Sequence, residues 1–154
     1  MLPVAGEVAA TDVVLDHTFG SAHAIEYVPL PKLLRRADFV SLHCALTAGT
    51  RGLMNERTFG LMRPGAYLIN TARGPVVEEE ALVQALRSRQ IAGAALDVFP
   101  DEPHIGVGLR EAPNVVLTPH MGGSANEALE RMMELALQNV TQVLGGGAPV
   151  GRVN

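Results

Sequence analysis

The sequence predicts an α/β protein built on a doubly wound parallel sheet. The predicted strands are nearly continuous apolar runs, and helical patterns separate most of them. Such runs are typical of parallel strands covered by helices on both faces of a sheet. Because the carboxyl ends of parallel strands share one edge, the polar residues that follow the strands should gather there. These residues are Asp16, His43, Asn70, Asp97 and His120.

Composition and charge exclude several classes of protein. The chain has 154 residues, 47% of them apolar and 18% charged, which predicts one folded domain and not a disordered chain. The net charge is −4 and no basic run exceeds Arg35-Arg36, so we expect no nucleic-acid partner. Cys44 is the only cysteine, which excludes an intrachain disulfide and a cysteine-based zinc site, and we expect no metal. No apolar stretch has the length of about 18 residues that a membrane span needs, so we expect a cytoplasmic protein without a membrane partner.

The first half of the chain shows two strand patterns and two helix patterns. Residues 13–16, Val-Val-Leu-Asp, and residues 39–42 are expected to be short strands. Residues 31–37 should form a helix with a proline in its first turn. Asn55 is a candidate cap for a helix over residues 56–62, which the Pro64-Gly65 pair would end.

The second half is organised around a strand at residues 66–69, whose following turn presents Arg73. A helix should run from the acidic residues at 78–80 to Arg89, since acid at its start and base at its end suit the helix dipole. Short strands are expected at 93–96 and 115–117.

A long helix is expected at the end of the chain, after a capping box formed by Ser124 and Glu127. Glycines 145–147 should end it. Its apolar stripe has the spacing of an ordinary core face. The stripe consists of Leu129, Met132, Met133, Ala136, Val140 and Val143.

Three ionisable residues should meet at the carboxyl edge of the sheet: Arg73, Glu102 and His120. Histidine titrates near neutrality and suits proton transfer between a carbonyl and an alcohol, and a carboxylate beside it favours its charged form. An arginine grips a carboxylate in two places, so the set suits a 2-keto or 2-hydroxy acid. Taken singly, each has a plainer interpretation: Arg73 as a solvated turn residue, Glu102 as a turn residue before proline, and His120 as a loop histidine bonded to backbone.

Four ordered segments resemble the signature blocks of the D-isomer-specific 2-hydroxyacid dehydrogenases, a family that includes phosphoglycerate dehydrogenase and glyoxylate and hydroxypyruvate reductases. The resemblance implies a Rossmann-like NAD-binding domain that transfers hydride between the nicotinamide and a small 2-keto or 2-hydroxy acid of the D series. It also implies a homodimer when the protein is full length. The segments are residues 68–74, 93–99, 101–103 and 114–120.

The same resemblance implies roles for individual residues. His120 would be the general acid and base, Glu102 its partner, and Arg73 the anchor of the substrate carboxylate and carbonyl. Asp16 would bind the adenosine ribose, and because His17 and Thr18 follow it in place of arginine, NAD is favoured over NADP. Asp16 could instead be a solvated aspartate in a turn. Gly122 and Gly123 could instead belong to a plain turn that leads into the last helix. The full set of implied cofactor-binding residues is Asp16, His43, Thr71, Ala72, Arg73, Asp97, His120, Gly122 and Gly123.

No Gly-x-Gly-x-x-Gly occurs in the chain, and only 12 residues precede the first predicted strand. We therefore expect a partial NAD-binding domain over residues 1–144 and a tail over 145–154, without the first Rossmann strand, the glycine loop or a substrate domain. In the Rossmann strand order the absent strand is central, and we expect strands 13–16 and 39–42 on one side of the gap. Alone, the chain should have little or no activity. The alternative is a non-catalytic remnant that binds nucleotide or another protein.

Overall fold

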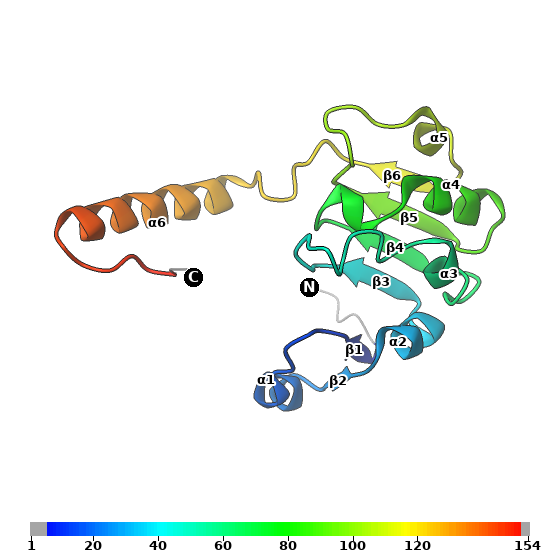
Figure 1. Ribbon diagram of the computed structural model, residues 1–154, viewed down its shortest axis with the longest axis horizontal. Helices are drawn as coiled ribbons and strands as arrows, with labels where there is room; N and C mark the ends of the chain where they lie inside the picture. The colour runs from blue at the N-terminus through cyan, green and yellow to red at the C-terminus, as the bar shows by residue number, and fades with distance from the viewer. Residues whose placement is uncertain (1–5, 152–154) are drawn as a thin grey trace. The chain divides into compact units, whose positions relative to one another are not determined.

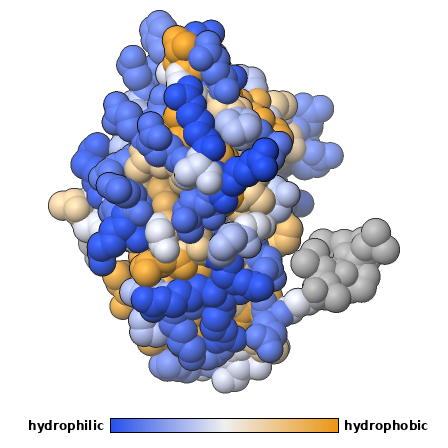
Figure 2. Space-filling model, turned by 90° about the vertical axis from the view of Figure 1, so that its right-hand side faces the viewer, coloured by the Kyte–Doolittle hydropathy of each residue, from blue (hydrophilic) through white to orange (hydrophobic). Residues whose placement is uncertain are grey.

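The computed structural model describes residues 6–151, which belong to two compact units, residues 1–119 and 120–154. Among the described residues, no helix combines the length and apolar character needed to cross a membrane. On the face shown in Figure 2, hydrophilic residues cover most of the surface and hydrophobic ones appear in patches between them.

The first unit contains a parallel four-stranded sheet in the order β3-β4-β5-β6 (Figure 1). Leu42, Asn70, Leu96 and Leu117 are paired in one row across the four strands. The strands therefore end level, and the residues that follow them are neighbours at one edge. The strands are β3 (Phe39–Leu42), β4 (Tyr67–Asn70), β5 (Gly93–Leu96) and β6 (Val115–Leu117).

Helices cover one face of this sheet. The helices that supply core residues are α2 (Leu30–Arg36), α3 (Glu56–Phe59), α4 (Glu79–Arg87) and α5 (Val107–Arg110). Their largest buried side chains, Leu34, Phe59, Leu82 and Leu109, join Leu68 of β4 in one cluster. Burial of such side chains from water is the main favourable contribution to the stability of this unit.

The opposite face of the sheet is exposed in the first unit. Phe39 is 66% exposed, Tyr67 43% and Val116 61%, whereas Val40 and Leu42 of the same strand β3 are buried. The Phe39 and Tyr67 rings stack with their centroids 5.5 Å apart. The expected α/β class and parallel sheet are confirmed, but among the described residues of this unit helices pack on one face only.

A second, two-stranded parallel sheet precedes the first one in the chain. It pairs β1 (Val8–Ala10) with β2 (Ile25–Tyr27), and α1 (His17–Ala22) connects them. The prediction of a strand at residues 13–16 is wrong, because this segment is irregular and Val13 is 98% exposed. Its apolar side chains gave the pattern of a buried strand without being buried.

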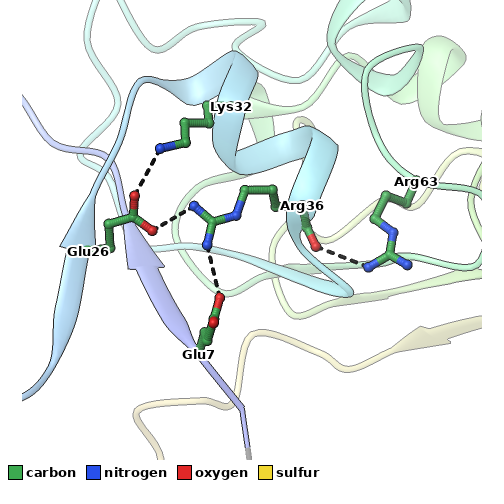
Figure 3. A network of polar contacts seen from close by, with 5 residues as sticks. All are labelled: Glu7, Glu26, Lys32, Arg36 and Arg63. Atoms are coloured by element: carbon green, nitrogen blue, oxygen red, sulfur yellow. Dashed lines mark hydrogen bonds and ion pairs between the residues drawn. The ribbon is translucent and has the colours of Figure 1, made fainter.

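An ionic network joins this small sheet to α2 (Figure 3). The Arg36 guanidinium pairs with Glu26 at 2.6 Å and with Glu7 at 2.9 Å, and Lys32 pairs with Glu26 at 2.9 Å. Hydrogen bonds from Lys32 and Arg36 lower the pKa of Glu26, and the bond to Glu26 raises the pKa of Arg36. Arg63 donates to the backbone oxygen of Arg36, so the network continues toward the region that follows α3.

Other elements agree with the sequence in part. The predicted cap at Asn55 is confirmed, and the structure adds Thr58 as a reciprocal partner in a capping box, although α3 ends at Phe59 instead of 62. The expectation that strands 13–16 and 39–42 share one side of a gap is wrong, because β3 pairs with β4 and only β1 and β2 form the other sheet.

The second unit contains one long helix, α6 (Asn126–Leu144). The expected capping box is wrong, since Ala125 is the N-cap and makes no side-chain capping bond. No residue of α6 is buried within the second unit taken by itself, and the expectation that its apolar stripe is an ordinary core face stays a prediction. The exposed fractions of Met132 and Met133 are 54% and 65%.

Candidate active site at the carboxyl edge of the four-stranded sheet

Asn70 shapes the turn that presents Arg73. Its side chain is 1% exposed, and its Oδ1 accepts a hydrogen bond from the Ala72 N–H at 3.0 Å. Its Nδ2 donates to the backbone oxygen of Arg73 at 3.1 Å. A buried amide whose two ends both bond to the turn fixes the backbone of residues 71–73. Thr71 is exposed on this turn and Ala72 is buried.

Arg73 is exposed at the end of this turn, and its Nη1 donates to the backbone oxygen of Ala72 at 2.6 Å. The residue after it, Gly74, begins a short 3-10 helix (Gly74–Val76) and is packed against Phe99 and Pro100. A Cβ at Gly74 would overlap the backbone atoms of those two residues. The arginine turn and the loop that follows β5 therefore touch backbone to backbone.

Asp97 is a buried carboxylate directly after β5, with 6% of its surface exposed. Its Oδ1 accepts a hydrogen bond from the Thr118 hydroxyl at 2.5 Å. The backbone N–H of Asp97 donates to the backbone oxygen of Asn70 at 3.0 Å. Burying a carboxylate is costly unless hydrogen bonds compensate it, and Thr118 supplies one of them. Sequence reasoning did not single out Thr118, although it stands directly after the last strand of the row.

Glu102 lies on the loop that follows β5 and is exposed. Its Oε1 accepts a hydrogen bond from the Phe99 N–H at 2.9 Å. This bond closes the loop on itself, so the carboxylate is held on the same loop that packs against Gly74.

His43 follows β3 at the same edge of the sheet. Its Nε2 lies 2.8 Å from the Ser41 hydroxyl, and the ring is exposed. The row of paired residues makes Leu42 the neighbour of Asn70, so His43 and Thr71 follow adjacent strands. The first unit thus gathers His43, Thr71, Arg73, Asp97 and Glu102 on one edge, with Thr118 added.

His120, Gly122 and Gly123 belong to the second unit. The backbone of His120 is in the left-handed region, with φ of 50°. A Cβ at Gly123 would meet open space, so this glycine is not required by packing. The contact of His120 with Glu102 and the roles of the two glycines stay predictions.

Asp16 has a structural role that the sequence did not reveal. It is the N-cap of α1, and its Oδ1 accepts a hydrogen bond from the Phe19 N–H at 2.8 Å. The acid nearest to the end of β1 is instead Asp12, whose Oδ1 accepts from the N–H of Val13 at 2.6 Å. A weak strand pattern at residues 8–10 was the only signal that could have pointed to Asp12.

No group of three or more metal-ligating side chains that could hold an ion occurs in the part of the chain that the structure describes. The site is therefore an arrangement of one exposed cation, one buried carboxylate and hydrogen-bonding groups. An exposed cation at the carboxyl edge of a parallel sheet suits an anionic organic ligand.

Residues 3–122 match the sequence profile of a family described as the D-isomer specific 2-hydroxyacid dehydrogenase, NAD binding domain. The chain is 46% identical over 129 residues to a glyoxylate reductase of Thermococcus litoralis, covering 84% of this chain and 39% of that protein. It is 50% identical over 131 residues to a glyoxylate reductase of Thermofilum pendens, with the same two coverages. The chain spans about two fifths of the length of these curated relatives.

Solved structures give the same result. The holo form of Rhodotorula graminis D-mandelate dehydrogenase is 36% identical with a TM-score of 0.87, covering 96% of this chain and 45% of that one. An NAD-complexed D-isomer specific 2-hydroxyacid dehydrogenase of Lactobacillus delbrueckii ssp. bulgaricus is 33% identical with a TM-score of 0.87, covering 97% and 49%. The chain is therefore similar in fold to part of these dehydrogenase chains.

Proposed function

Because this chain belongs to the D-isomer specific 2-hydroxyacid dehydrogenase family, we propose that it carries the nicotinamide-side half of a dehydrogenase active site. The reaction would transfer hydride between NAD and a small 2-keto or 2-hydroxy acid of the D series. The observation that carries the proposal is that exposed Arg73 and buried Asp97, whose Oδ1 accepts a hydrogen bond from Thr118, both follow neighbouring strands at the carboxyl edge of one parallel sheet.

The residues at this edge fit the nicotinamide end of the cofactor. A carboxamide needs both a hydrogen-bond acceptor and donors, and Asp97 supplies a carboxylate whose position is fixed by Thr118. His43 and the 71–72 turn follow adjacent strands and would line the groove beside it. At the adenosine end, we assign the ribose hydroxyls to Asp12 instead of Asp16, because Asp12 follows β1 and the carboxylate of Asp16 caps α1. A carboxylate there disfavours a 2′-phosphate, which supports NAD over NADP.

NAD supplies the hydride acceptor or donor when it is bound. Arg73 would grip the substrate carboxylate and polarise the carbonyl through its planar donor fork. His120 would give a proton to the carbonyl oxygen during reduction and remove it from the hydroxyl during oxidation. Glu102 would hold the imidazole in the orientation for this transfer and stabilise its charged form. The hydrogen bond from the Phe99 N–H to Oε1 of Glu102 ties this carboxylate to its own loop.

The test is a chimera that joins this chain to the part of the Thermococcus litoralis glyoxylate reductase outside the 129 matched residues. We expect it to consume NADH with glyoxylate or hydroxypyruvate, followed by absorbance at 340 nm. His120→Ala in the chimera should lower kcat by about 10²-fold or more, the usual loss for a general acid, with little change in NADH affinity. Arg73→Lys should mainly raise KM for the keto acid, because one point charge replaces a two-point grip.

Two results would refute this proposal. One is a folded chimera that binds NADH but reduces no 2-keto acid, which would favour a nucleotide-binding remnant. The other is an unchanged kcat in the His120→Ala chimera. The unmodified 154-residue chain serves as the comparison and should show no turnover of its own.

A further inference from the structure

The loop that connects β3 to α3 is folded around one hydroxyl, that of Thr50. The Thr50 Oγ1 donates a hydrogen bond to the backbone oxygen of Ala45 at 2.6 Å and accepts one from the backbone N–H of Thr47 at 2.8 Å. The backbone N–H groups of Thr50 and Arg51 both donate to the Thr47 oxygen, at 3.3 and 3.0 Å, which closes a turn between the two threonines. A half-buried hydroxyl therefore braces the backbone on the β3 side of this turn.

The part of the loop next to β3 has few other restraints. Cys44 and Leu46 are half-buried and pack against the core of the first unit, whereas Ala45 between them is exposed. Among residues 6–151, the backbone groups of residues 44–46 form no hydrogen bond other than the one from the Thr50 hydroxyl to the Ala45 oxygen. Without that bond only side-chain packing would hold this segment, and backbone with so few restraints opens at low cost.

The part of the loop next to α3 is fixed independently of this hydroxyl. Three backbone hydrogen bonds join residues 52–54 to residues 75–78, the segment that follows the arginine turn. They run from the Gly52 N–H to the Pro75 oxygen at 2.9 Å, from the Met54 N–H to the Val76 oxygen at 3.0 Å, and from the Glu78 N–H to the Met54 oxygen at 2.8 Å. Loss of the Thr50 hydroxyl should therefore release residues 44–47 and leave the arginine turn in place.

We infer that Thr50 is a positioning residue for residues 44–47, which we call the groove wall. The inference rests on the proposed function, in which His43 and the segment after it lie beside the 71–72 turn at the carboxyl edge of the sheet, where ligands of parallel sheets bind. Thr50 acts through the backbone of the groove wall. It acts on the cofactor and not on the keto acid, because the two hydrogen bonds of the Asn70 side chain fix the arginine turn separately.

The first experiment uses Cys44 as a reporter, because it is the only cysteine of the 154-residue chain and lies in the groove wall. The measurement is the rate at which the Cys44 thiol reacts with an aromatic disulfide reagent that releases a coloured thiolate. Thr50→Val removes the hydroxyl at nearly constant size and should raise this rate by about tenfold or more, because the released backbone exposes the thiol. Thr50→Ala should raise it as much, whereas Thr50→Ser keeps the hydroxyl and should preserve the rate of the unmodified chain.

Thr118→Val is the matched control for this experiment. It makes the same side-chain change at another hydroxyl of the first unit, one that bonds to Asp97 and not to the groove wall. It should leave the rate of the Cys44 thiol unchanged, which separates local release of the groove wall from a general loss of stability. Urea denaturation of each variant establishes that it is folded under the conditions of the assay.

The second experiment measures cofactor binding in the chimera with the Thermococcus litoralis glyoxylate reductase. Thr50→Val should raise the Kd for NADH, measured by fluorescence titration, by about fivefold or more, because the groove wall is no longer held for the cofactor. The KM for the keto acid, measured at saturating NADH, should stay within about twofold, since the arginine turn keeps its own hydrogen bonds. Thr50→Ser should restore the affinity for NADH.

An unchanged Cys44 rate in Thr50→Val and Thr50→Ala would overturn the inference, as would an equal rise in Thr118→Val or Thr50→Ser. A Kd for NADH that Thr50→Val leaves unchanged would also overturn it, and so would a keto-acid KM that rises as much as that Kd. A chimera that binds NADH but reduces no keto acid counts against the proposed reaction alone, because the thiol rate and the Kd for NADH need no turnover.

Discussion

The hydroxyl of Thr118, at the end of β6, donates a hydrogen bond to Oδ1 of Asp97, at the end of β5, over 2.5 Å. The bond joins two neighbouring strands at the edge where the candidate site lies. It links the buried carboxylate to the last strand before the chain enters its second unit.

Thr118→Val should destabilise the first unit, because it removes a donor from a buried carboxylate without changing the size of the side chain. Hydrogen bonds to charged groups contribute about 1.5–3 kcal/mol, and we expect a loss of the free energy of unfolding in that range. Urea denaturation followed by circular dichroism measures it. Thr118→Ser keeps the hydroxyl and should lose clearly less, and equal losses in the two variants would show that the hydroxyl contributes nothing.

Gly74→Ala should be more harmful than an ordinary surface change, because its Cβ would overlap the backbone of Phe99 and Pro100. Overpacking costs about 1–3 kcal/mol, and the arginine turn and the Glu102 loop should separate to relieve it. Thermal unfolding reports the loss. Gly108 lies in α5, and a Cβ there would contact Val83 of α4 at an ordinary distance of 3.7 Å. Gly108→Ala should therefore stabilise the chain by up to about 1 kcal/mol, because alanine favours the helical conformation over glycine.

Glu79→Gln should stabilise the chain at neutral pH. Burial, and to a lesser degree the charge of Glu80, raise the pKa of Glu79 above its usual value of 4.5. The folded state therefore holds this proton more tightly than the unfolded state, so stability falls as pH rises from 4.5 through the raised pKa. The variant removes that part of the pH dependence.

The free energy of unfolding, measured in urea between pH 4 and pH 7.5, tests this prediction. The difference between Glu79→Gln and the unmodified chain should grow with pH. Glu80→Gln should act in the same direction but less, because its charge is the second cause of the shift. A difference that shrinks toward neutral pH would contradict the assignment.

Arg36→Met should loosen the small sheet, because Arg36 pairs with both Glu7 and Glu26. The effect should shrink in 1 M NaCl, since exposed ion pairs are screened by salt. It should also shrink in acid: the pKa of Glu26 is lowered by Lys32 and Arg36, so its contribution is complete above 4.5 and is lost as pH falls through the lowered value. Hydrogen exchange of β1 and β2 amides is the measurement.

Arg35→Met is the matched control on the same helix, because among residues 6–151 the Arg35 guanidinium bonds only to the Pro31 backbone oxygen, at 3.5 Å. It should leave exchange in β1 and β2 unchanged. Equal effects of the two substitutions would mean that the stem of the side chain matters and the ion pairs do not.

The sequence by itself determined the four-stranded sheet and the edge that carries the candidate site. Strands 39–42, 93–96 and 115–117 were predicted with the bounds that the structure shows, and strand 66–69 within one residue. Each of these strands contributes side chains to the core or packs against it, so a continuous apolar run in the sequence corresponds to a buried strand in the structure. The polar residues that follow them then meet because parallel strands end at one edge.

Only the tertiary structure decided the rest. It made β1 and β2 strands by pairing them with each other, and it made Asp16 a helix cap, whose carboxylate accepts a hydrogen bond from the Phe19 N–H. Within the first unit it also left exposed the face of the four-stranded sheet that carries Phe39, Tyr67 and Val116. Apolar spacing records which face a segment is able to bury, whereas the presence of a partner to bury it depends on packing between segments far apart in sequence or in different chains.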